Sequence, residues 1–479
     1  MNKSMVRYLL SKLLLIEASL MLVPVIVAFI YKEDFHVIIS LGATIGILVI
    51  LGLLGAAFKP KNYHVYTKEG LLIVALCWIL WSFFGALPFV LSGQIPSIID
   101  AFFEMVSGFT TTGATILPDV AVLSHSLLFW RSFAHLIGGM GVLVFALAIM
   151  ENSKNSHLEV MRAEVPGPVF GKVVSKLKET AQILYVIYLS MFAILMVILM
   201  VAGMPAFDSI ITAMGCAGTG GCGVYNDSIA HYNSSLITNI VSIAVLLFGI
   251  NFNLYYFLLL RKFKAFFKDE ELRTYIGIVV IATALIWLNV SGLYPSTSKA
   301  LENSLFEVAN VMTTTGFGVT DLTVWPLFAQ VILLFLMFVG GSAGSTAGGI
   351  KVMRTLILTK IARNQVLSTL YPNRIMTIHI NEQPLDKEIQ HGVLKYLTLY
   401  VFLLLGLTLM LSLDNNNFMV VVSAATSTFN NIGPMLGTSQ TFAIFSPFSK
   451  LLMSFAMIAG RLEIYPMLLL FIPKTWSKY

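Results

Sequence analysis

The chain carries little charge for its length. Its 479 residues include 24 Asp and Glu and 30 Lys and Arg, so that charged residues make up only 11%, about half the share that is usual in soluble proteins. This shortage excludes a disordered chain, a basic nucleic-acid-binding arm and an ordinary soluble enzyme. The net charge of +6 therefore indicates a bias among loops at a membrane and no nucleic-acid partner.

The chain also lacks the residue patterns of common catalytic and metal sites. Its three cysteines, Cys77, Cys216 and Cys222, have no CxxC spacing and predict neither a disulfide framework nor a zinc site. No HExxH motif occurs, and the glycine-rich stretch that ends at Lys351 lacks the GK[ST] ending of a phosphate-binding loop. No GxGxxG motif follows a strand pattern either. We expect no enzymatic activity and no organic cofactor.

Long apolar runs are what the chain has in abundance. Hydrophobic residues make up 57% and the mean hydropathy is +0.85. About 20 helical residues cross the roughly 30 Å hydrocarbon core of a bilayer. Ten runs are interpreted as crossings: 9–31, 37–58, 71–91, 127–150, 183–202, 236–260, 275–293, 331–339 with its continuation, 394–413 and 451–472. The sequence thus predicts an all-α integral membrane protein.

The basic residues predict the orientation of these crossings. With the N-terminus inside, the inside segments hold 25 of the 30 Lys and Arg, so we expect both termini in the cytoplasm. The first run is too long for the apolar part of a signal peptide and is predicted to be a retained helix. The inside loops 151–180, 261–273 and 351–395 could also contact anionic lipid or a soluble partner.

Four short segments resemble one another and fall between the long runs. Each has about a dozen helical residues followed by a Thr/Gly- or Asn/Gly-rich stretch, and the glycines align at 108, 95 and 117 residue intervals as Gly113, Gly221, Gly316 and Gly433. This spacing predicts one unit used four times, each a crossing, a half-length helix, an extended loop and a second crossing. We divide the chain into 1–68 (two extra crossings), 69–180, 181–272, 273–385 and 386–479.

The physics of these loops favours a pore. Irregular backbone at membrane depth leaves polar groups unpaired at several kcal/mol each, unless it lines a water-filled path. Glycine permits dihedral angles that let successive carbonyls face one axis, and four such loops would make a ring of oxygens that replaces a cation's hydration shell. The alternative is four loops that merely turn the chain. Asp119, Asp227 and Asp321 follow the first three loops and would either concentrate cations or be ordinary loop residues.

The loops TTTGAT, GTGGCG, TTTGFG and NNIGPMLG resemble the four filter loops of the Trk/Ktr/HKT superfamily of potassium-uptake proteins. The segments IGGMGVLVFALAIM, GGSAGSTAGGIKVMR and IAGRLEIYP, and the two extra N-terminal crossings, resemble its Trk-type membrane subunit. The resemblance implies four pseudo-fourfold M1–P–M2 units in a bacterial inner membrane. It implies K⁺ as the transported ion, a homodimer and a separate cytosolic ring of nucleotide-binding subunits. It also implies a filter made by Thr111, Thr112, Gly113, Thr219, Gly220, Gly221, Thr314, Thr315, Gly316, Asn431, Ile432 and Gly433.

The stretch 340–349 holds five glycines in ten residues, too many for a continuous helix at about 1 kcal/mol each relative to alanine. We interpret it as a break below the loops; the alternative is a close packing face of small residues. The resemblance implies an intramembrane gating loop, whose residues we take as Gly344, Ser345, Thr346, Gly348 and Gly349.

Arg461 lies within an apolar run, so it should face the protein interior. Its expected partners are carbonyls of 340–349, and the alternative is a clamp with Glu463 or Glu17. The resemblance implies that Arg461 contributes to gating. Arg131 is expected to extend toward the outer surface and is assigned no role.

Several related functions remain open from the sequence alone. A Na⁺-permeable member is disfavoured by the four glycines, because in related transporters a serine at a filter glycine is associated with sodium transport. Coupling to H⁺ or Na⁺ is not determined. A secondary transporter with broken helices usually shows two related halves, whereas this chain shows four quarter-units.

Overall fold

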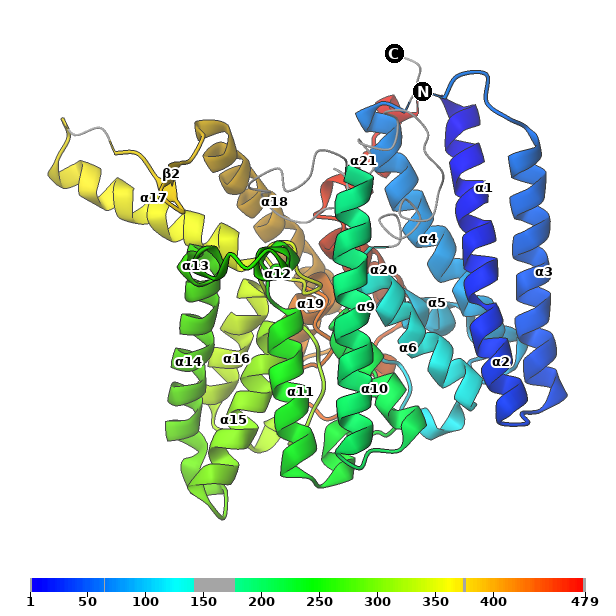
Figure 1. The fold of residues 1–479 in the computed structure, drawn as a ribbon, viewed down its shortest axis with the longest axis horizontal. Helices are drawn as coiled ribbons and strands as arrows, with labels where there is room; N and C mark the ends of the chain where they lie inside the picture. The colour runs from blue at the N-terminus through cyan, green and yellow to red at the C-terminus, as the bar shows by residue number, and fades with distance from the viewer. Residues whose placement is uncertain (1, 64, 142–176, 374–375, 477–479) are drawn as a thin grey trace.

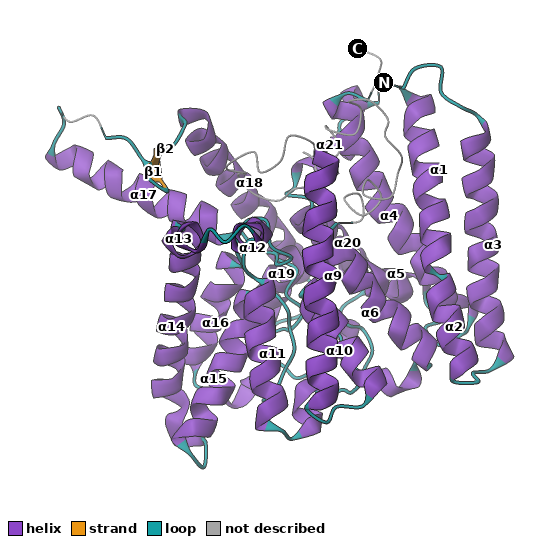
Figure 2. Cartoon of the chain, in the orientation of Figure 1, coloured by secondary structure: helices purple, strands orange, loops and turns teal. Residues whose placement is uncertain are grey.

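The computed structural model describes residues 2–63, 65–141, 177–373 and 376–476. In this part of the chain the regular structure is helical apart from β1 (His379–Ile380) and β2 (Gln383–Pro384), an antiparallel hairpin (Figure 2). The predicted all-α class is confirmed. The start of the first helix and the last described residues lie on one side of the molecule (Figure 1), which we call the terminal side.

Two helical segments precede the repeats. The first consists of α1 (Lys3–Leu20) and α2 (Leu22–Ile30), and the second is α3 (Phe35–Ala57); both are long and apolar enough to cross a membrane. Gly52 and Gly55 of α3 face α1, where a Cβ at Gly55 would lie closer than 3.0 Å to the Ser11 side chain. Small residues thus let the two backbones approach closely, as is usual for helices that associate in lipid.

The four predicted units follow in order, each with a long helix, a half-length helix and a second helix. The units contain α4 (Thr67–Leu91), α5 (Ile98–Phe109) and α6 (His125–Gly139); α9 (Leu177–Val201), α10 (Ala206–Gly218), α11 (Ser235–Phe248), α12 (Phe252–Leu259) and α13 (Phe263–Lys268); α14 (Glu270–Val290), α15 (Thr297–Met312), α16 (Leu327–Val339) and α17 (Val352–Leu370); and α18 (Lys387–Leu411), α19 (Phe418–Phe429), α20 (Pro447–Arg461) and α21 (Tyr465–Phe471). Short 3₁₀ turns join them: η1 (Val120–Val122), η2 (Ser228–Tyr232), η3 (Ser291–Leu293), η4 (Leu322–Val324), η5 (Phe442–Ile444) and η6 (Pro473–Thr475).

The sequence predicted ten full crossings with one break, at 340–349, and the structure shows further breaks. Among the described residues six helices, or seven with one bent pair, are long and apolar enough to cross a membrane. The end of α16 at Val339 agrees with the predicted break. The run 236–260 bends by 91° between α11 and α12, and α20 ends at Arg461 before Glu463 and Ile464 adopt positive φ; these two breaks were not predicted. Residues 142–150 of the run 127–150 and residues 151–176 of the loop 151–180 lie outside the described residues. Hydropathy measures how apolar a run is and does not detect such breaks.

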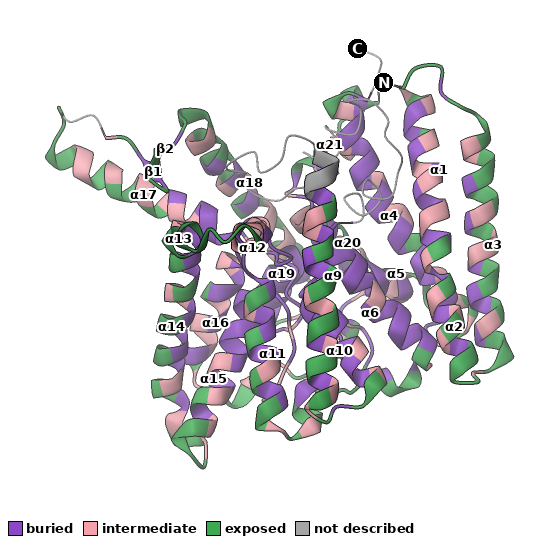
Figure 3. Cartoon of the chain, viewed as in Figure 1, coloured by how far each residue is buried: buried purple, intermediate pink, exposed green. Residues whose placement is uncertain are grey.

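The half-length helices form the buried centre of the molecule (Figure 3). All residues of α5 from Ala101 to Phe109 and all residues of α19 from Ser423 to Phe429 are buried. The second helix of each unit packs against the half-length helix of the next, in the pairs α6–α10, α11–α15, α16–α19 and α20–α5. The last pair returns to the first unit, so the four units close into a ring.

Candidate functional site

Each half-length helix ends in the same backbone motif. The twelve predicted loop residues form four triplets, 111–113, 219–221, 314–316 and 431–433. In each triplet the second residue donates its N–H to the carbonyl five residues earlier, at 2.8–2.9 Å. The four hydrogen bonds run from Thr112 to Ser107, Gly220 to Gly215, Thr315 to Asn310 and Ile432 to Ser427. The first residue of each triplet has a left-handed conformation, with φ of 56°, 54°, 55° and 57° at Thr111, Thr219, Thr314 and Asn431. This is the arrangement of a Schellman cap, which usually has glycine at the left-handed position. A threonine there costs about 1–2 kcal/mol, so the surrounding structure must hold it.

The third residue of each triplet is the aligned glycine, and it also has positive φ. The values are 75°, 66°, 86° and 108° at Gly113, Gly221, Gly316 and Gly433. Positive φ therefore occurs at the first and third residues, with the middle residue of ordinary sign, and the third position is one where glycine carries no steric cost. The same alternation occurs in all four loops although their sequences differ.

The four loops contact one another in a closed cycle. A Cβ built on Gly113 would lie closer than 3.0 Å to the carbonyl oxygen of Gly220, and one on Gly221 equally close to that of Thr315. The cycle is completed by Gly316 against the Ile432 carbonyl and Gly433 against the Thr112 carbonyl. Only glycine fits such an approach. The structure therefore brings the twelve predicted loop residues together around one axis, in the order of the units.

Buried polar groups hold the loops from behind. Glu104 on α5 accepts hydrogen bonds from the Thr115 hydroxyl at 3.0 Å and the Ile116 amide at 3.1 Å. Arg131 on α6 pairs with the same carboxylate at 2.5 Å, and both side chains are buried. The expectation that Arg131 extends to the surface was therefore wrong. Its position near a helix end does not reveal that α6 packs this face against α5.

The third unit repeats the carboxylate support. Glu307 lies nine residues before Gly316, as Glu104 lies nine before Gly113, and it accepts the Val319 amide at 3.2 Å. We number the loops 1 to 4 after their units. In loop 4 a neutral group takes almost the same place, where the Ser423 hydroxyl accepts the Leu436 amide at 2.9 Å. Loops 1 and 3, which lie opposite each other in the ring, thus share a buried acid.

The segment 340–351 is not helical and lies against two of the loops. It begins at Gly340, with φ of 71°, and the Gly348 amide donates to the Thr314 hydroxyl at 2.6 Å. The next amide, of Gly349, donates to the Asn430 carbonyl at 3.1 Å. The predicted helix break at 340–349 is confirmed. Its glycines also serve close packing, since a Cβ at Gly348 would be closer than 3.0 Å to that same carbonyl.

Arg461 connects this segment to the first unit. Its Nη1 donates to the Thr346 carbonyl at 2.7 Å, which confirms the predicted partner. Its Nη2 donates to the carbonyls of Gly138 and Gly139, both at 2.6 Å, and these two acceptors were not anticipated. Glu463 pairs instead with Arg354, at 2.6 Å. The guanidinium of unit 4 thus contacts units 1 and 3, which lie opposite each other in the ring.

Two further charged residues of this region were missed. Lys351 was counted among the inside-loop charges, but it is 3% exposed, and its ammonium donates to the Ala347 carbonyl within the same segment. Glu271 on α14 is 1% exposed and accepts backbone amides from the segment. The available signal was that Lys351 lies two residues after the glycine-rich stretch 340–349 in an apolar context, which is unusual for a surface residue. No such signal marks Glu271.

The acidic residues after the first three loops, Asp119, Asp227 and Asp321, are exposed to solvent. Asp119 accepts the Asn226 side-chain amide at 2.9 Å. Asp321 accepts the amide and the hydroxyl of Thr323 at 2.9 and 2.7 Å, and these hydrogen bonds lower the pKa of Asp321. Asp227 lies 3.4 Å from the His231 ring. All three remain candidates for attracting cations. No group of three His, Cys, Asp or Glu among the described residues is placed to bind a metal.

Comparisons with known proteins agree over nearly the whole chain. A family model described as "TrkH: Cation transport protein" matches residues 41–478. The Trk system potassium uptake protein TrkH of Salmonella typhimurium is 33% identical, over 97% of this chain and 98% of that protein. The protein TrkG of the Escherichia coli Trk system is 31% identical, over 95% of each. The crystal structure of the potassium transporter TrkH from Vibrio parahaemolyticus matches with a TM-score of 0.89 at 30% identity and covers 100% of both chains.

Proposed function

Because the chain belongs to the TrkH family of cation transport proteins, we propose that it carries K⁺ into the cell through the four loops. The relatives are named as potassium uptake proteins. The observation that carries the proposal is the closed cycle of loop contacts, in which each aligned glycine lies against a carbonyl of the next loop. Such a ring offers oxygen ligands and no formal charge, which suits a cation that exchanges its hydration water for carbonyls.

The proposed ligands are backbone carbonyls of the twelve loop residues. Glycine stands at all four aligned positions, so no side chain enters the cycle of contacts. The buried acids Glu104 and Glu307 would hold two opposite loops at a fixed separation. The units, bounded at residues 68, 180, 272 and 385, would each contribute one quarter of the path. A ring of four quarter-units also differs from the two related halves of broken-helix secondary transporters.

The segment 340–349 and Arg461 would form the gate. Gly348 and Gly349 hydrogen-bond to loops 3 and 4, and the Arg461 guanidinium reaches carbonyls of units 1 and 3. A charge that bridges opposite units of a ring lies in the path of the ion and repels it. Short side chains in the segment would let it move aside when the pore opens.

The charge bias supports our proposal that the terminal side faces the cytoplasm, and we propose a bacterial inner membrane as the location. We propose further that the chain forms a homodimer and works with a separate cytosolic nucleotide-binding subunit. The name "Trk system", which the relatives carry, supports a role as the membrane component of a larger assembly.

The test is tracer Rb⁺ uptake into proteoliposomes that contain K⁺, with Na⁺-loaded vesicles as the comparison. Gly316→Ser should lower the preference for K⁺ over Na⁺, because a side chain there meets the Ile432 carbonyl. Gly318→Ser is the matched control, since no atom lies within 4 Å of a Cβ at Gly318. A variant with 340–349 shortened separates a closed pore from an absent one. Folded protein in which neither the parent nor the shortened variant passes Rb⁺ would overturn the proposal.

A further inference from the structure

Three consecutive acidic residues begin α14 and contact three different parts of the molecule. Asp269 is the N-cap, and its side chain accepts the Leu272 amide at 2.8 Å. Glu270 and Glu271 form the first turn of the helix. Acidic side chains are favoured at a helix start, but that preference alone explains neither the burial of Glu271 nor the partners of the other two.

Glu271 joins the two ends of the segment 340–351. Its Oε1 accepts the Ala343 amide at 2.6 Å and the Met353 amide at 3.1 Å. Ala343 follows the end of α16, and Met353 is the second residue of α17. A single carboxylate oxygen therefore binds the chain where it enters the segment and again where it leaves. Because Glu271, Ala343 and Met353 are all buried, loss of the carboxylate would leave two amide donors without solvent to replace it.

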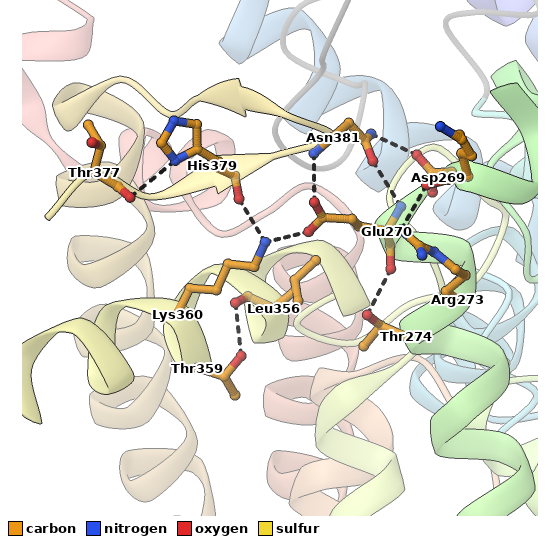
Figure 4. Close-up of polar contacts among 11 residues, drawn as sticks. Asp269, Glu270, Arg273, Thr274, Leu356, Thr359, Lys360, Thr377, His379 and Asn381 are labelled. Carbon is orange, nitrogen blue, oxygen red and sulfur yellow. Dashed lines mark hydrogen bonds and ion pairs between the residues drawn. The ribbon is translucent and has the colours of Figure 1, made fainter. Parts of the chain in front are cut away.

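Glu270 and Asp269 bind the hairpin on the terminal side (Figure 4). The Asn381 amide donates to Glu270 Oε1 at 3.1 Å, and the Glu270 amide donates to Asn381 Oδ1 at 2.8 Å. The Asn381 side-chain amide also donates to Asp269 at 2.9 Å. Lys360 of α17 pairs with Glu270 and donates to the His379 carbonyl at 2.7 Å.

The hairpin geometry is fixed by the turn that carries Asn381. Asn381 and Glu382 have φ of 48° and 66° and lie between the paired residues Ile380 and Gln383. Two positive φ values in a two-residue loop indicate a type I′ turn, in which asparagine is a favoured first residue. The Asn381 side chain is thus held in place by its own turn when it contacts α14.

From these contacts we infer that the first turn of α14 couples the hairpin 379–384 to the segment 340–351, with Glu271 as the positioning residue that keeps the segment in place. The inference depends on the proposed gate. Glu270 and Glu271 are neighbours in a helix and cannot move independently. Both also bind α17, at Lys360 and at Met353, which are seven residues or about 10 Å of helix apart. A displacement of the hairpin therefore acts on the hydrogen bonds that hold both ends of the segment.

The experiment compares substitutions that keep or remove these hydrogen bonds. Glu271→Gln retains an acceptor oxygen at the place of Oε1, whereas Glu271→Ala loses both bonds. We expect Glu271→Ala to raise basal Rb⁺ flux at least about tenfold, Glu271→Gln to stay close to the parent, and the K⁺ preference to be unchanged in both. An altered ion preference in Glu271→Ala would overturn the inference, because it would show that Glu271 supports the loops and does not act on the segment alone.

The hairpin half of the inference has its own variant. Asn381→Gly tolerates the positive φ of the turn and deletes the side-chain bonds to α14, so it should also raise basal flux. Glu382→Gly, at the neighbouring exposed turn position, is the matched control and should not. If Glu271→Ala fails to fold, Asn381→Gly carries the test alone, and a parent-like flux from it would overturn the coupling.

A second readout does not depend on ion flux. Ser345 is 6% exposed and the native cysteines are buried, so Ser345→Cys reports movement of the segment by its rate of thiol labelling. Glu271→Ala should accelerate that labelling at least about tenfold, by the same loss of two hydrogen bonds. Faster labelling without any Rb⁺ flux would refute the proposed function and support the positioning role. If Glu271→Ala shows the same labelling and flux as the parent while the variant with the shortened segment shows strong flux, the positioning role is refuted and the proposed function is not.

Discussion

Replacing Arg461 by glutamine should open the proposed ion path, and the size of the effect follows from the contacts of Arg461 with opposite units of the ring. Two unit charges 4 Å apart interact by about 4 kcal/mol at an effective dielectric constant of 20, which corresponds to about a thousandfold in the population of a K⁺ ion beside the guanidinium. Loss of the three carbonyl partners of Arg461 also destabilises the closed arrangement. Relaxation of side chains and water will reduce the effect, so we expect at least about a tenfold rise in flux.

The assay for Arg461 is Rb⁺ uptake by proteoliposomes without any added partner protein. Arg461→Lys keeps the charge but lacks the planar fork that reaches several carbonyls at once, so its flux should fall between those of the parent and Arg461→Gln. Lys264→Gln, which removes a positive charge from an exposed position, should leave the flux unchanged. If Arg461→Gln conducts no faster than the parent while the variant with the shortened segment does, the charge is not the barrier.

Two further predictions concern the loops. Arg131→Met leaves the buried carboxylate of Glu104 without its cation and should lower the stability of the folded protein by about 3–5 kcal/mol, seen as a lower thermal midpoint in detergent. The double variant Arg131→Met with Glu104→Leu should recover part of that loss. Equal midpoints for the single and the double variant would argue against a buried ion pair. The pKa of Asp321 is lowered in the folded protein, so the charge of Asp321 and the stability it contributes are retained above its ordinary pKa and disappear only as the pH falls through the lower folded value. Asp321→Asn should therefore reduce uptake at low ionic strength by the same factor at neutral and at mildly acidic pH. If the uptake of the variant and of the parent became equal on mild acidification, this expectation would be contradicted.

The parts of the site that depend on local sequence could be predicted. The all-α class followed from the long apolar runs, and the four aligned loops followed from the spacing of Gly113, Gly221, Gly316 and Gly433. The family was indicated by a resemblance of the loop sequences and their flanks. The family match and the contact cycle agree with these expectations. The break at 340–349 was predictable because glycine weakens helices wherever it occurs. The partner of Arg461 in that segment followed from the scarcity of unpaired acceptors in an apolar environment.

The parts that depend on packing between distant segments could not be predicted. Arg131 is buried because α6 lies against α5, and nothing in its own neighbours shows that. Lys351 has the charge of a loop residue, so a rule that counts basic residues assigns it to the surface. Glu271 begins α14, where an acid is expected on helix grounds alone, and only the fold brings it to amides 72 and 82 residues away.

The closed ring of unequal units has a consequence for stoichiometry. A pore built from four identical chains must place four copies of any residue around its axis, and four guanidinium groups there would repel one another. In a single chain, the fourth unit supplies Arg461 and the third unit supplies the segment 340–351, although the backbone of all four loops follows the same plan. Under the proposed function, covalent linkage thus separates the two requirements: the ion would meet a fourfold set of oxygens, while the proposed barrier would be present in one copy and would be removed by a single conformational change.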